Sequence, residues 1–303
     1  MTLSIIIPTY KGKALLQKHL PQVLVAARKN DEIIIVDDAS HDDTLDWLRD
    51  YFDLKSTESL YSDAVCYIGS KKSITVKVLI NQRNLRFASS CNRGVATAKG
   101  EIIFLVNNDV SPEPDIFNFL LPHFEDKKVF AVGCKELAAS EGDKAYGRSG
   151  GKFQRGFFVH FREPDQNQSE TFWVSGGSGA FRKSMWDILS GFDPDYRPAY
   201  EEDIDLSWRA REKGWKILFE PKAVVHHVHE STNASVFGKR RMEIMSYKNM
   251  FIFVWKNARG TDLVWHFLWL PYHFVFTNIR SRGKFMQGFF MALKQKLFGV
   301  VYS

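Results

Sequence analysis

An α/β fold with a mostly parallel, doubly wound sheet is the architecture that this sequence predicts. Four short apolar runs rich in strand formers, at residues 3–7, 32–36, 75–80 and 102–106, alternate with segments of helical periodicity. Strands that alternate with helices in this way usually form parallel βαβ units. At 303 residues and 45% hydrophobic composition, the chain is long enough to bury one large core.

The run at 102–106 is the centre of this prediction. Its five apolar residues are too few to span a membrane and suit a strand buried on both faces of a sheet. The run is followed by Asn107, Asn108 and Asp109. A carboxylate just past the carboxyl end of a buried strand lies where open α/β sheets bind ligands. Asn and Asp are also ordinary turn residues, so a solvated turn is the alternative at this point.

The segments between the strands carry their own expectations. Pro21 lies within a helical pattern and predicts a break or kink. Ser40, with Asp43 three residues later, is expected to cap the next helix. Residues 53–73 are polar and irregular, which indicates an insertion, and small side chains at 88–99 predict a helix that packs closely on the sheet.

The second half of the chain has a different character. Residues 132–161 contain short apolar pieces interrupted by Gly, Lys and Arg, which predicts irregular strands. The glycine-rich stretch 173–181 fits a ligand loop and a tight turn equally well. Acids at 201–205 open a helix, where they favour the macrodipole even without a function. Two short strands, 215–219 and 223–225, then lead into His226, His227 and His229.

Cysteine usage and the N-terminus indicate a reduced, cytosolic protein. Three cysteines (Cys66, Cys91 and Cys134) without CxxC spacing argue against a disulfide framework and a zinc cluster. A strand begins almost at once, without the basic region and long apolar run of a secretory leader. Neither a GxGxxG nor a GxxxxGKS/T motif occurs, so a nucleotide at the sheet edge would need carboxylates and a cation.

A series of short motifs, each weak by itself, follows in order along the chain. They are Ile7-Pro8-Thr9-Tyr10, Val36-Asp37-Asp38-Ala39-Ser40, Asn84-Leu85-Arg86-Phe87-Ala88, Asn92-Arg93-Gly94, Ala98-Lys99-Gly100-Glu101, Asn107-Asn108-Asp109, Gly177-Ser178-Gly179-Ala180, Gly191-Phe192-Asp193, Tyr200-Glu201-Glu202-Asp203-Ile204-Asp205-Leu206 and Pro221-Lys222-Ala223-Val224-Val225-His226-His227. In order and spacing they resemble the family 2 glycosyltransferases, which have the GT-A nucleotide-sugar fold. The resemblance covers roughly residues 4–231. Its closest subgroup is the bacterial transferases of surface polysaccharide synthesis, often rhamnosyltransferase-like.

The resemblance implies an inverting enzyme that moves a sugar from a nucleotide-diphosphate donor to an acceptor hydroxyl, in cell-surface polysaccharide or lipopolysaccharide synthesis. It divides the chain into a GT-A catalytic domain at 1–238 and a tail at 239–303. Within the catalytic domain, the nucleotide-binding half is expected at about 1–112 and the acceptor half at about 113–238. The expected acceptor is a glycan or a lipid-linked molecule.

The same resemblance implies roles for individual residues. Asp203 is the expected general base, with Glu202 beside it. A divalent cation, Mg²⁺ or Mn²⁺, is expected on Asp109 and a histidine, for which His227 aligns better than His226. The expected nucleotide-binding residues are Pro8, Thr9, Tyr10, Asp37, Asp38, Asn84, Asn107 and Asn108, and the expected sugar loop is Gly177, Ser178 and Gly179.

Two positions depart from the family pattern. Asn107 stands where the family usually has the first acid of Asp-x-Asp, which removes one carboxylate from the metal site. Arg86 stands where the family commonly has Gly. This arginine either alters the loop or places a cation near the phosphates.

The tail from Lys239 onward has eleven Lys and Arg against two acids, so it carries the positive balance of a chain whose net charge is +6. Trp and Phe are interleaved with the basic residues, and the longest apolar-rich stretch, 263–276, has fourteen residues. A membrane span needs roughly 20. We therefore expect amphipathic helices that hold the enzyme on the inner, cytoplasmic face of an anionic membrane. A helical subdomain on the core or a homodimer contact is the alternative, and nucleic acid is not an expected partner.

Two other functions stand as alternatives. A sugar nucleotidyltransferase would need a Gly-x-Gly-Thr-Arg loop after the first strand, and residues 8–12 do not supply one. A membrane-bound scaffold with a decayed transferase site would fit the acid that is missing at Asn107. Glu202, Asp203 and Asp109 are retained, which argues against decay.

Overall fold

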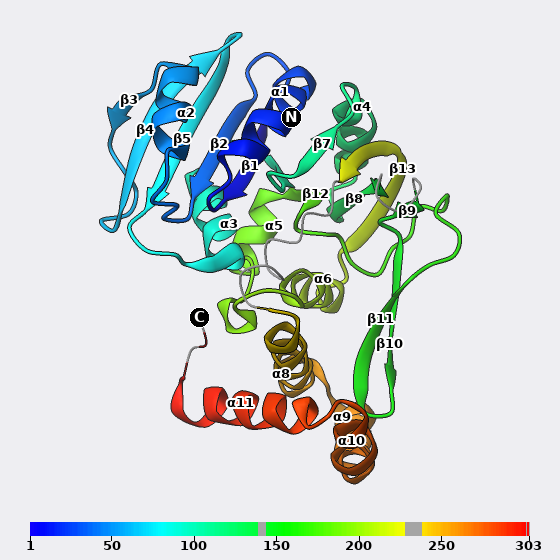
Figure 1. Cartoon of the computed structure of the whole chain (residues 1–303). Coiled ribbons are helices and arrows are strands. Elements are labelled where there is room, and N and C mark those ends of the chain that lie inside the picture. Colours follow the sequence, from blue (N-terminus) through cyan, green and yellow to red (C-terminus); the bar gives the residue numbers. More distant parts are fainter. Residues whose placement is uncertain (139–143, 228–237, 301, 303) are drawn as a thin grey trace.

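Parallel strands form the centre of a mixed sheet (Figure 1). The computed structural model describes residues 1–138, 144–227, 238–300 and 302. The strands of the sheet are β1 (Leu3–Thr9), β2 (Glu32–Asp37), β3 (Lys55–Thr57), β4 (Ala64–Lys71), β5 (Ile74–Asn81), β6 (Ile102–Val106), β7 (Val110–Pro112), β8 (Val129–Ala138), β9 (Lys144–Tyr146), β12 (Ser178–Arg182) and β13 (Lys216–His227). Their order is β3-β4-β5-β2-β1-β6-β12-β8-β13-β7, with β9 paired to β8. Because β5, β2, β1 and β6 are parallel, the predicted α/β core is confirmed.

Helices bury both faces of the central strands. They are α1 (Lys13–Ala26), α2 (Thr44–Phe52), α3 (Arg86–Thr97), α4 (Ile116–Leu120), the 3₁₀ helix η1 (Leu121–Glu125), α5 (Lys183–Ile188), the 3₁₀ helix η3 (Pro194–Tyr196) and α6 (Glu202–Glu212). Ile5 and Ile7 of β1 face a core shared with α1 and α2, whereas Ile6 faces a second core shared with α3 and α6. This alternation has the two-residue period of a strand, and both sets are apolar because both faces are covered.

Three local expectations are wrong. Residues 53–73 are not an irregular insertion, since they form β3 and β4, which extend the sheet antiparallel to β5. The helix α1 continues through Pro21, because tertiary burial of its apolar face outweighs the lost backbone hydrogen bond. Ser40 does not cap α2, since its hydroxyl oxygen accepts a hydrogen bond from the Lys11 N–H instead.

The second half is more regular than the sequence predicts. The two short strands expected at 215–219 and 223–225 form one strand, β13, with a register shift between Glu220 and Val224. A separate hairpin of β10 (Ser149–Gln154) and β11 (Phe157–Arg162) reaches from the sheet to the C-terminal helices (Figure 1). Its turn has positive φ at two successive residues, as two-residue hairpin turns require.

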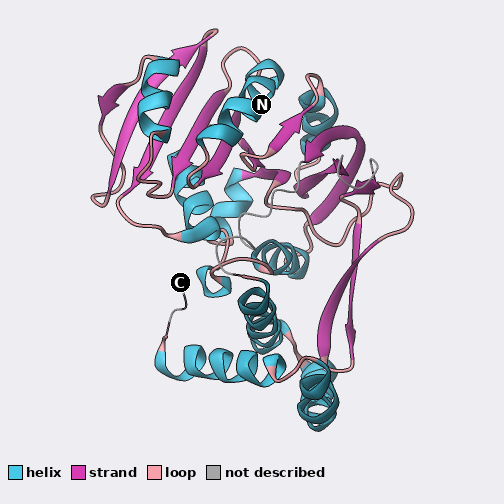
Figure 2. Cartoon of the chain, in the orientation of Figure 1, coloured by secondary structure: helices cyan, strands magenta, loops and turns pink. Residues whose placement is uncertain are grey.

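The C-terminal segment packs on the rest of the chain through its first helix. Its elements are α8 (Lys239–Asn257), α9 (Gly260–Tyr272), the π-helix η4 (His273–Thr277), α10 (Asn278–Arg280) and α11 (Lys284–Phe298). In Figures 1 and 2, α8 lies between α6 and α11. Phe251 and Phe253 of α8 pack against Phe157 and Phe158 of the hairpin and Trp208 of α6. Among the described residues, no helix has the length and apolar character needed to cross a membrane.

Phe251→Ala should lower the free energy of unfolding by about 3–5 kcal/mol, because this side chain is fully buried and its removal leaves a cavity. Phe298→Ala is the control, since Phe298 lies in the same segment with 74% of its surface exposed, and we expect a change below about 0.5 kcal/mol. Urea unfolding of both variants measures the difference. Equal stability of the two variants would show that α8 is not part of the core.

Candidate active site

The loops that follow β1 and β6 meet at the carboxyl edge of the sheet. The side-chain nitrogen of Asn108 donates a hydrogen bond to the Thr9 hydroxyl oxygen over 2.8 Å. A Cβ atom at Gly12 would overlap both of these side chains, so only glycine fits there. Two predicted nucleotide-binding residues are therefore adjacent, and Pro8 and Tyr10 flank Thr9 in the chain.

Asp38 holds the next loop in place. One carboxylate oxygen accepts hydrogen bonds from the Asn81 side chain and the Leu85 N–H, and the other accepts the Arg86 N–H, all at 2.8 Å. These bonds satisfy backbone donors at the start of α3. The neighbouring Asp37 accepts a main-chain N–H of its own turn at 2.8 Å, and burial raises its pKa.

The backbone conformation of Arg86 explains why the resemblance expects glycine there. Its φ is +71°, in the left-handed region. The Arg86 N–H also lies 3.1 Å from the side-chain oxygen of Asn84, which accepts it. A non-glycine residue in this conformation costs roughly 1–2 kcal/mol. The substitution therefore strains the backbone while the loop is retained.

Asp109 and His227 come together where β13 pairs with β7. Nε2 of His227 lies 3.3 Å from Oδ1 of Asp109, and Nδ1 lies 2.6 Å from a carboxylate oxygen of Glu136. Burial lowers the pKa of His227, but the two carboxylates outweigh burial and raise it to about 10. His226 pairs with Glu113 at 2.7 Å instead, and His229 lies outside the described residues.

Asp109 and His227 fit a divalent cation. Oδ1 of Asp109 is buried and accepts no well-aligned hydrogen bond from the described residues. Two ligand atoms each about 2.2 Å from one hexacoordinate ion lie about 3 Å apart, close to the 3.3 Å observed. Glu136 supplies the carboxylate that commonly orients a metal-binding imidazole. Within the described ranges, no three or more His, Cys, Asp or Glu side chains are grouped so that they could hold a metal ion.

Three consecutive carboxylates stand at the start of α6. Tyr200 and Glu201 both have left-handed φ, 76° and 74°, which turns the chain into the helix. Asp203 accepts the N–H of Gly176 at 3.4 Å, and burial raises its pKa to about 6. Burial and the neighbouring acids raise the pKa of Glu201 to about 8 and that of Glu202 well above its usual range. Of Asp203 and Glu201, Asp203 therefore loses its proton at the lower pH.

The glycine-rich loop before β12 connects this acid cluster to the sheet edge. Gly176 donates its N–H to Asp203. The carbonyl oxygen of the next residue, Gly177, accepts the N–H of Asn107 at 2.9 Å. A Cβ atom at Gly177 would lie only 2.7 Å from the Asn107 side chain, so glycine permits this approach. The other predicted loop residues, Ser178 and Gly179, already belong to β12. One short loop thus contacts both the expected base and the expected nucleotide-binding edge.

Two residues of α8 hold the turn that precedes the acid cluster, and sequence reasoning missed them. The Asn249 side-chain nitrogen donates to three carbonyl oxygens of residues 196–200, each at 2.9 Å. The Lys248 ammonium donates to two carbonyl oxygens of residues 195–197, at 2.7 and 3.1 Å. Both side chains are fully buried. The available signal was a Lys-Asn pair directly before the apolar run 250–255 of this helix, because buried polar groups need partners.

Comparison with known proteins gives matches over most of the chain. Residues 4–189 match the family described as glycosyl transferase family 2, and residues 102–297 match glycosyl transferase family group 2. The O-antigen chain rhamnosyltransferase RfbN of Salmonella typhimurium is 23% identical over 239 residues, which cover 78% of this chain and 69% of that protein. The second family match extends into α11, so it includes the C-terminal helices.

Solved structures share the fold. TarS residues 1–349 of S. aureus, in complex with UDP-GlcNAc, align with a TM-score of 0.61 at 14% identity, over 97% of this chain and 81% of that one. The mannosyltransferase PcManGT of Pyrobaculum calidifontis, in complex with GDP-Man and Mn²⁺, gives a TM-score of 0.59 at 15% identity, over 98% and 87%. The expected GT-A fold is thereby confirmed.

Asn249→Leu should release the turn at 195–200, because leucine keeps the volume of the side chain and removes the three hydrogen bonds. Amide hydrogen exchange of this segment, followed by mass spectrometry, should accelerate by about 5- to 150-fold, as expected for a loss of about 1–3 kcal/mol. Asn167→Leu, at an exposed position, is the control and should leave the exchange unchanged. Unchanged exchange in Asn249→Leu would mean that the turn is held without α8.

Proposed function

This chain belongs to glycosyl transferase family 2, and we propose that it is an inverting enzyme that transfers a sugar from a nucleotide-diphosphate donor to an acceptor hydroxyl. The name of the Salmonella relative supports a place for this reaction in the synthesis of a cell-surface polysaccharide or lipopolysaccharide. The observation that carries the proposal is the position of Asp203, a partly buried carboxylate joined by one loop to the polar edge of the sheet.

Asp203 is the general base of the proposed reaction. It accepts the proton of the acceptor hydroxyl while that oxygen attacks the anomeric carbon of the donor sugar. The bond from this carbon to the diphosphate breaks, and the nucleoside diphosphate leaves with both electrons of that bond. Attack opposite the leaving group in a single displacement inverts the anomeric configuration. Glu202 stays protonated beside Asp203 because burial raises its pKa, so it does not compete for the same proton.

The donor nucleotide binds at the edge where the loops after β1, β2 and β6 meet. The groups that face it there are Pro8, Thr9, Tyr10, Asp37, Asn84, Asn107 and Asn108, and the sugar lies against Gly177, Ser178 and Gly179. Asp38 acts as a positioning residue, because both of its oxygens already accept hydrogen bonds from the protein.

Asp109 and His227 hold Mg²⁺ or Mn²⁺ beside the donor. When bound, the ion stabilises the negative charge that develops on the leaving diphosphate. The Mn²⁺ in the archaeal mannosyltransferase structure supports this assignment. An imidazole ligand favours Mn²⁺ over Mg²⁺. Asn107 supplies no charge where the family usually has the first acid of Asp-x-Asp, so the affinity for the ion is modest.

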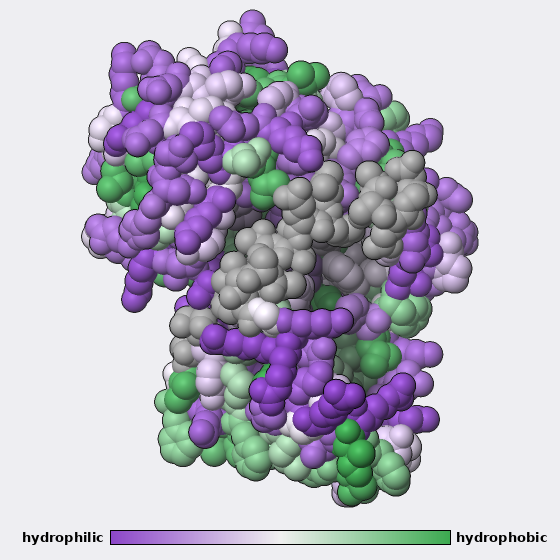
Figure 3. Space-filling model, in the orientation of Figure 1, coloured by the Kyte–Doolittle hydropathy of each residue, from purple (hydrophilic) through white to green (hydrophobic). Residues whose placement is uncertain are grey.

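The outer face of the C-terminal helices holds the enzyme on the cytoplasmic, inner face of a membrane. Its exposed apolar side chains are Trp265, Phe267 and Leu268 of α9, Val275 and Phe276 of η4, Ile279 of α10, and Phe290, Leu297 and Phe298 of α11. Figure 3 shows hydrophobic residues along the lower edge of the molecule, where these helices lie. Exposed Arg280, Arg282 and Lys294 add positive charge, which favours anionic lipid. A second copy of the chain is the alternative occupant of this face.

Asp203→Asn should lower kcat by about 10²–10⁴-fold while donor affinity changes little, because an amide cannot accept the proton. Asp187→Asn is the matched control, since Asp187 is a surface acid on α5 paired with Lys183. The donor is first identified from a panel of nucleotide sugars by thermal shift with Mn²⁺. Transfer is then measured with that donor. A kcat within about twofold of wild type would remove Asp203 from the mechanism.

Removal of divalent metal with EDTA should abolish transfer, and Mn²⁺ should restore it better than Mg²⁺. In Asp109→Asn the Mn²⁺ concentration for half-maximal activity should rise at least about tenfold, because the one carboxylate ligand is lost. Asp115→Asn is the control, because Asp115 is exposed and follows β7 in the chain, whereas Asp109 precedes it. Full activity of the metal-stripped wild type in excess EDTA would rule the metal out.

Full-length protein should sediment with vesicles that contain anionic lipid, and the double variant Phe267→Glu, Leu268→Glu should not, because it puts two acids on the apolar face of α9. Ile188→Glu changes an equally exposed apolar residue on α5 and should sediment as wild type does. Point substitutions are used because a truncation before α8 would remove part of the core. Equal sedimentation of all three proteins contradicts a role for this face.

A further inference from the structure

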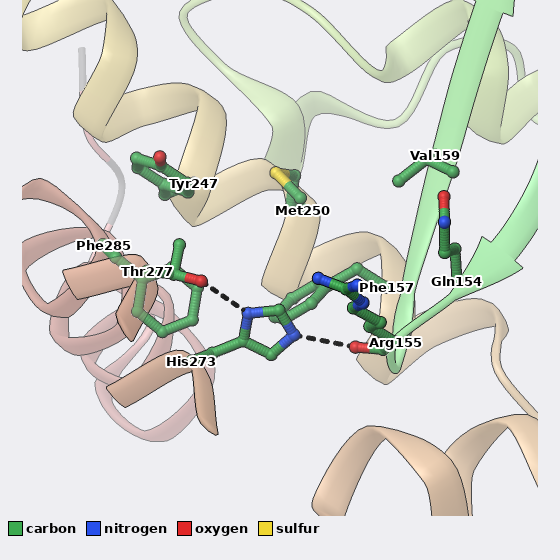
Figure 4. Close-up of a pocket in the computed structure, with 9 residues that line it drawn as sticks. All are labelled: Gln154, Arg155, Phe157, Val159, Tyr247, Met250, His273, Thr277 and Phe285. Atoms are coloured by element: carbon green, nitrogen blue, oxygen red, sulfur yellow. Dashed lines mark hydrogen bonds between the residues drawn. The ribbon is translucent and has the colours of Figure 1, made fainter. Parts of the chain in front are cut away.

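A cavity of about 320 Å³ lies between the tip of the β10–β11 hairpin and the C-terminal helices (Figure 4). Its walls are mainly apolar and are formed by Phe157 and Val159 of β11, Tyr247 and Met250 of α8, and Phe285 of α11. Arg155, at the hairpin turn, contributes a cationic side chain. Among the described residues, no carboxylate lines this cavity. It is therefore an apolar space with one positive charge at its wall.

The charge of Arg155 is available to an anion. Its guanidinium group lies 5.6 Å from the ring centres of Trp269 and Tyr272 and donates a hydrogen bond to the Tyr272 hydroxyl over 3.4 Å, and it forms no ion pair with a carboxylate of the described residues. His273 is the other titratable group of the wall. Both of its ring nitrogens are used, toward the Thr277 hydroxyl and the Arg155 carbonyl oxygen, each at 2.8 Å (Figure 4).

Two elements connect this cavity to the acid cluster. On β11, Val159 lines the cavity, and the next residue, His160, lies 3.8 Å from the Glu201 carboxylate. On α8, Tyr247 and Met250 line the cavity, while the two residues between them hold the turn before α6. On both β11 and α8, residues that line the cavity are thus next in sequence to residues that contact the segment 195–201 before α6.

We propose that this cavity binds the lipid end of an acceptor that carries a lipid phosphate, with the phosphate against Arg155 and the first part of the apolar chain between the aromatic walls. The inference rests on the proposed function, because it concerns the acceptor of that transfer. The volume is about twice that of a cavity that holds one benzene ring, which suits a short length of chain. The chain continues onto the exposed side chains of Phe276 and Ile279, which flank Thr277 of the cavity wall.

An apolar chain fits this space better than a sugar does. Sugar hydroxyls buried in an apolar pocket need hydrogen-bond partners, and an unmade hydrogen bond is expensive. Of the uncharged polar residues of the wall, Gln154 and Tyr247 are left for such bonds, since His273 and Thr277 already bond to each other. A charge-assisted contact between phosphate and guanidinium then fixes the end of the chain.

Farnesyl phosphate below its micelle concentration is the probe, with farnesol and inorganic phosphate as comparisons. Isothermal titration calorimetry with the full chain should show that farnesyl phosphate binds, that farnesol binds at least about tenfold more weakly, and that inorganic phosphate does not bind detectably. Equal binding of farnesol would overturn the role of Arg155. Inorganic phosphate that binds as well as farnesyl phosphate would assign the site to a free anion and overturn the lipid. A complete lack of farnesyl phosphate binding would also overturn the proposed lipid site.

Two variants locate the probe. Met250→Trp fills the cavity and should remove farnesyl phosphate binding, whereas Val264→Trp places the same ring on an exposed position of α9 and should not. Arg155→Gln should weaken binding to the level of farnesol, whereas Arg83→Gln, at an exposed position after β5, should not. Undiminished binding to Met250→Trp would place the lipid elsewhere and contradict the inference.

Donor binding separates this inference from the proposed function. The thermal shift with nucleotide sugar and Mn²⁺ should be the same in wild type, Met250→Trp and Arg155→Gln, which also shows that the variants are folded. A wild type that transfers sugar but does not bind farnesyl phosphate contradicts only the cavity. A wild type that binds farnesyl phosphate but neither binds nor turns over any nucleotide sugar contradicts the proposed function.

Discussion

The acids that we propose as catalytic depend on two buried polar side chains that come from a helix late in the sequence. Burial lowers the pKa of Lys248 to about 7, and its ammonium hydrogens have three acceptors, two main-chain carbonyls and the Gln295 side chain. Asn249 donates to three further carbonyls of the same turn. Without Asn249, the buried carbonyls of Tyr196 and Ala199 would lose this donor, at about 1–3 kcal/mol each. Because α8 also contributes Phe251 and Phe253 to the core, the acid cluster and the C-terminal helices form one structural unit.

The two ends of the site have different electrostatic requirements. At the sheet edge, Asp109 and Glu136 keep a negative charge beside His227, which a divalent cation needs. At the start of α6, burial raises the pKa of all three acids, that of Glu201 to about 8 and that of Asp203 to about 6, so of these two Asp203 loses its proton at the lower pH. Asn107 lowers the charge at the first end only. Its main-chain N–H still bonds to the glycine-rich loop, and any residue could make that bond. The missing acid therefore lowers the charge available to the proposed metal while the loop keeps its contacts, which argues against a decayed transferase.

The sequence predicted those features whose cause lies close by in the chain. The parallel strands, for example, follow from apolar runs. The pairing of Asp109 with His227, which are distant in the chain, follows from the family resemblance, and the two side chains lie 3.3 Å apart. Prediction failed where the deciding partner is distant. Ser40 bonds to Lys11 on another loop rather than capping its own helix. Residues 53–73 become strands only because β5 offers an edge. The main-chain acceptors of Lys248 and Asn249 lie about fifty residues upstream, so an amphipathic pattern could not reveal them.

The pH dependence of kcat/KM for sugar transfer at saturating Mn²⁺ tests the central claim most directly. Asp203 works as a base only when it is ionised, and burial raises its pKa to about 6. If Asp203 is the general base, kcat/KM should rise with pH and level off above about pH 7, with an apparent pKa near 6 that belongs to the interacting pair Glu202 and Asp203. A profile that is flat between about pH 5 and 7, or that rises as the pH falls, would contradict this role of Asp203.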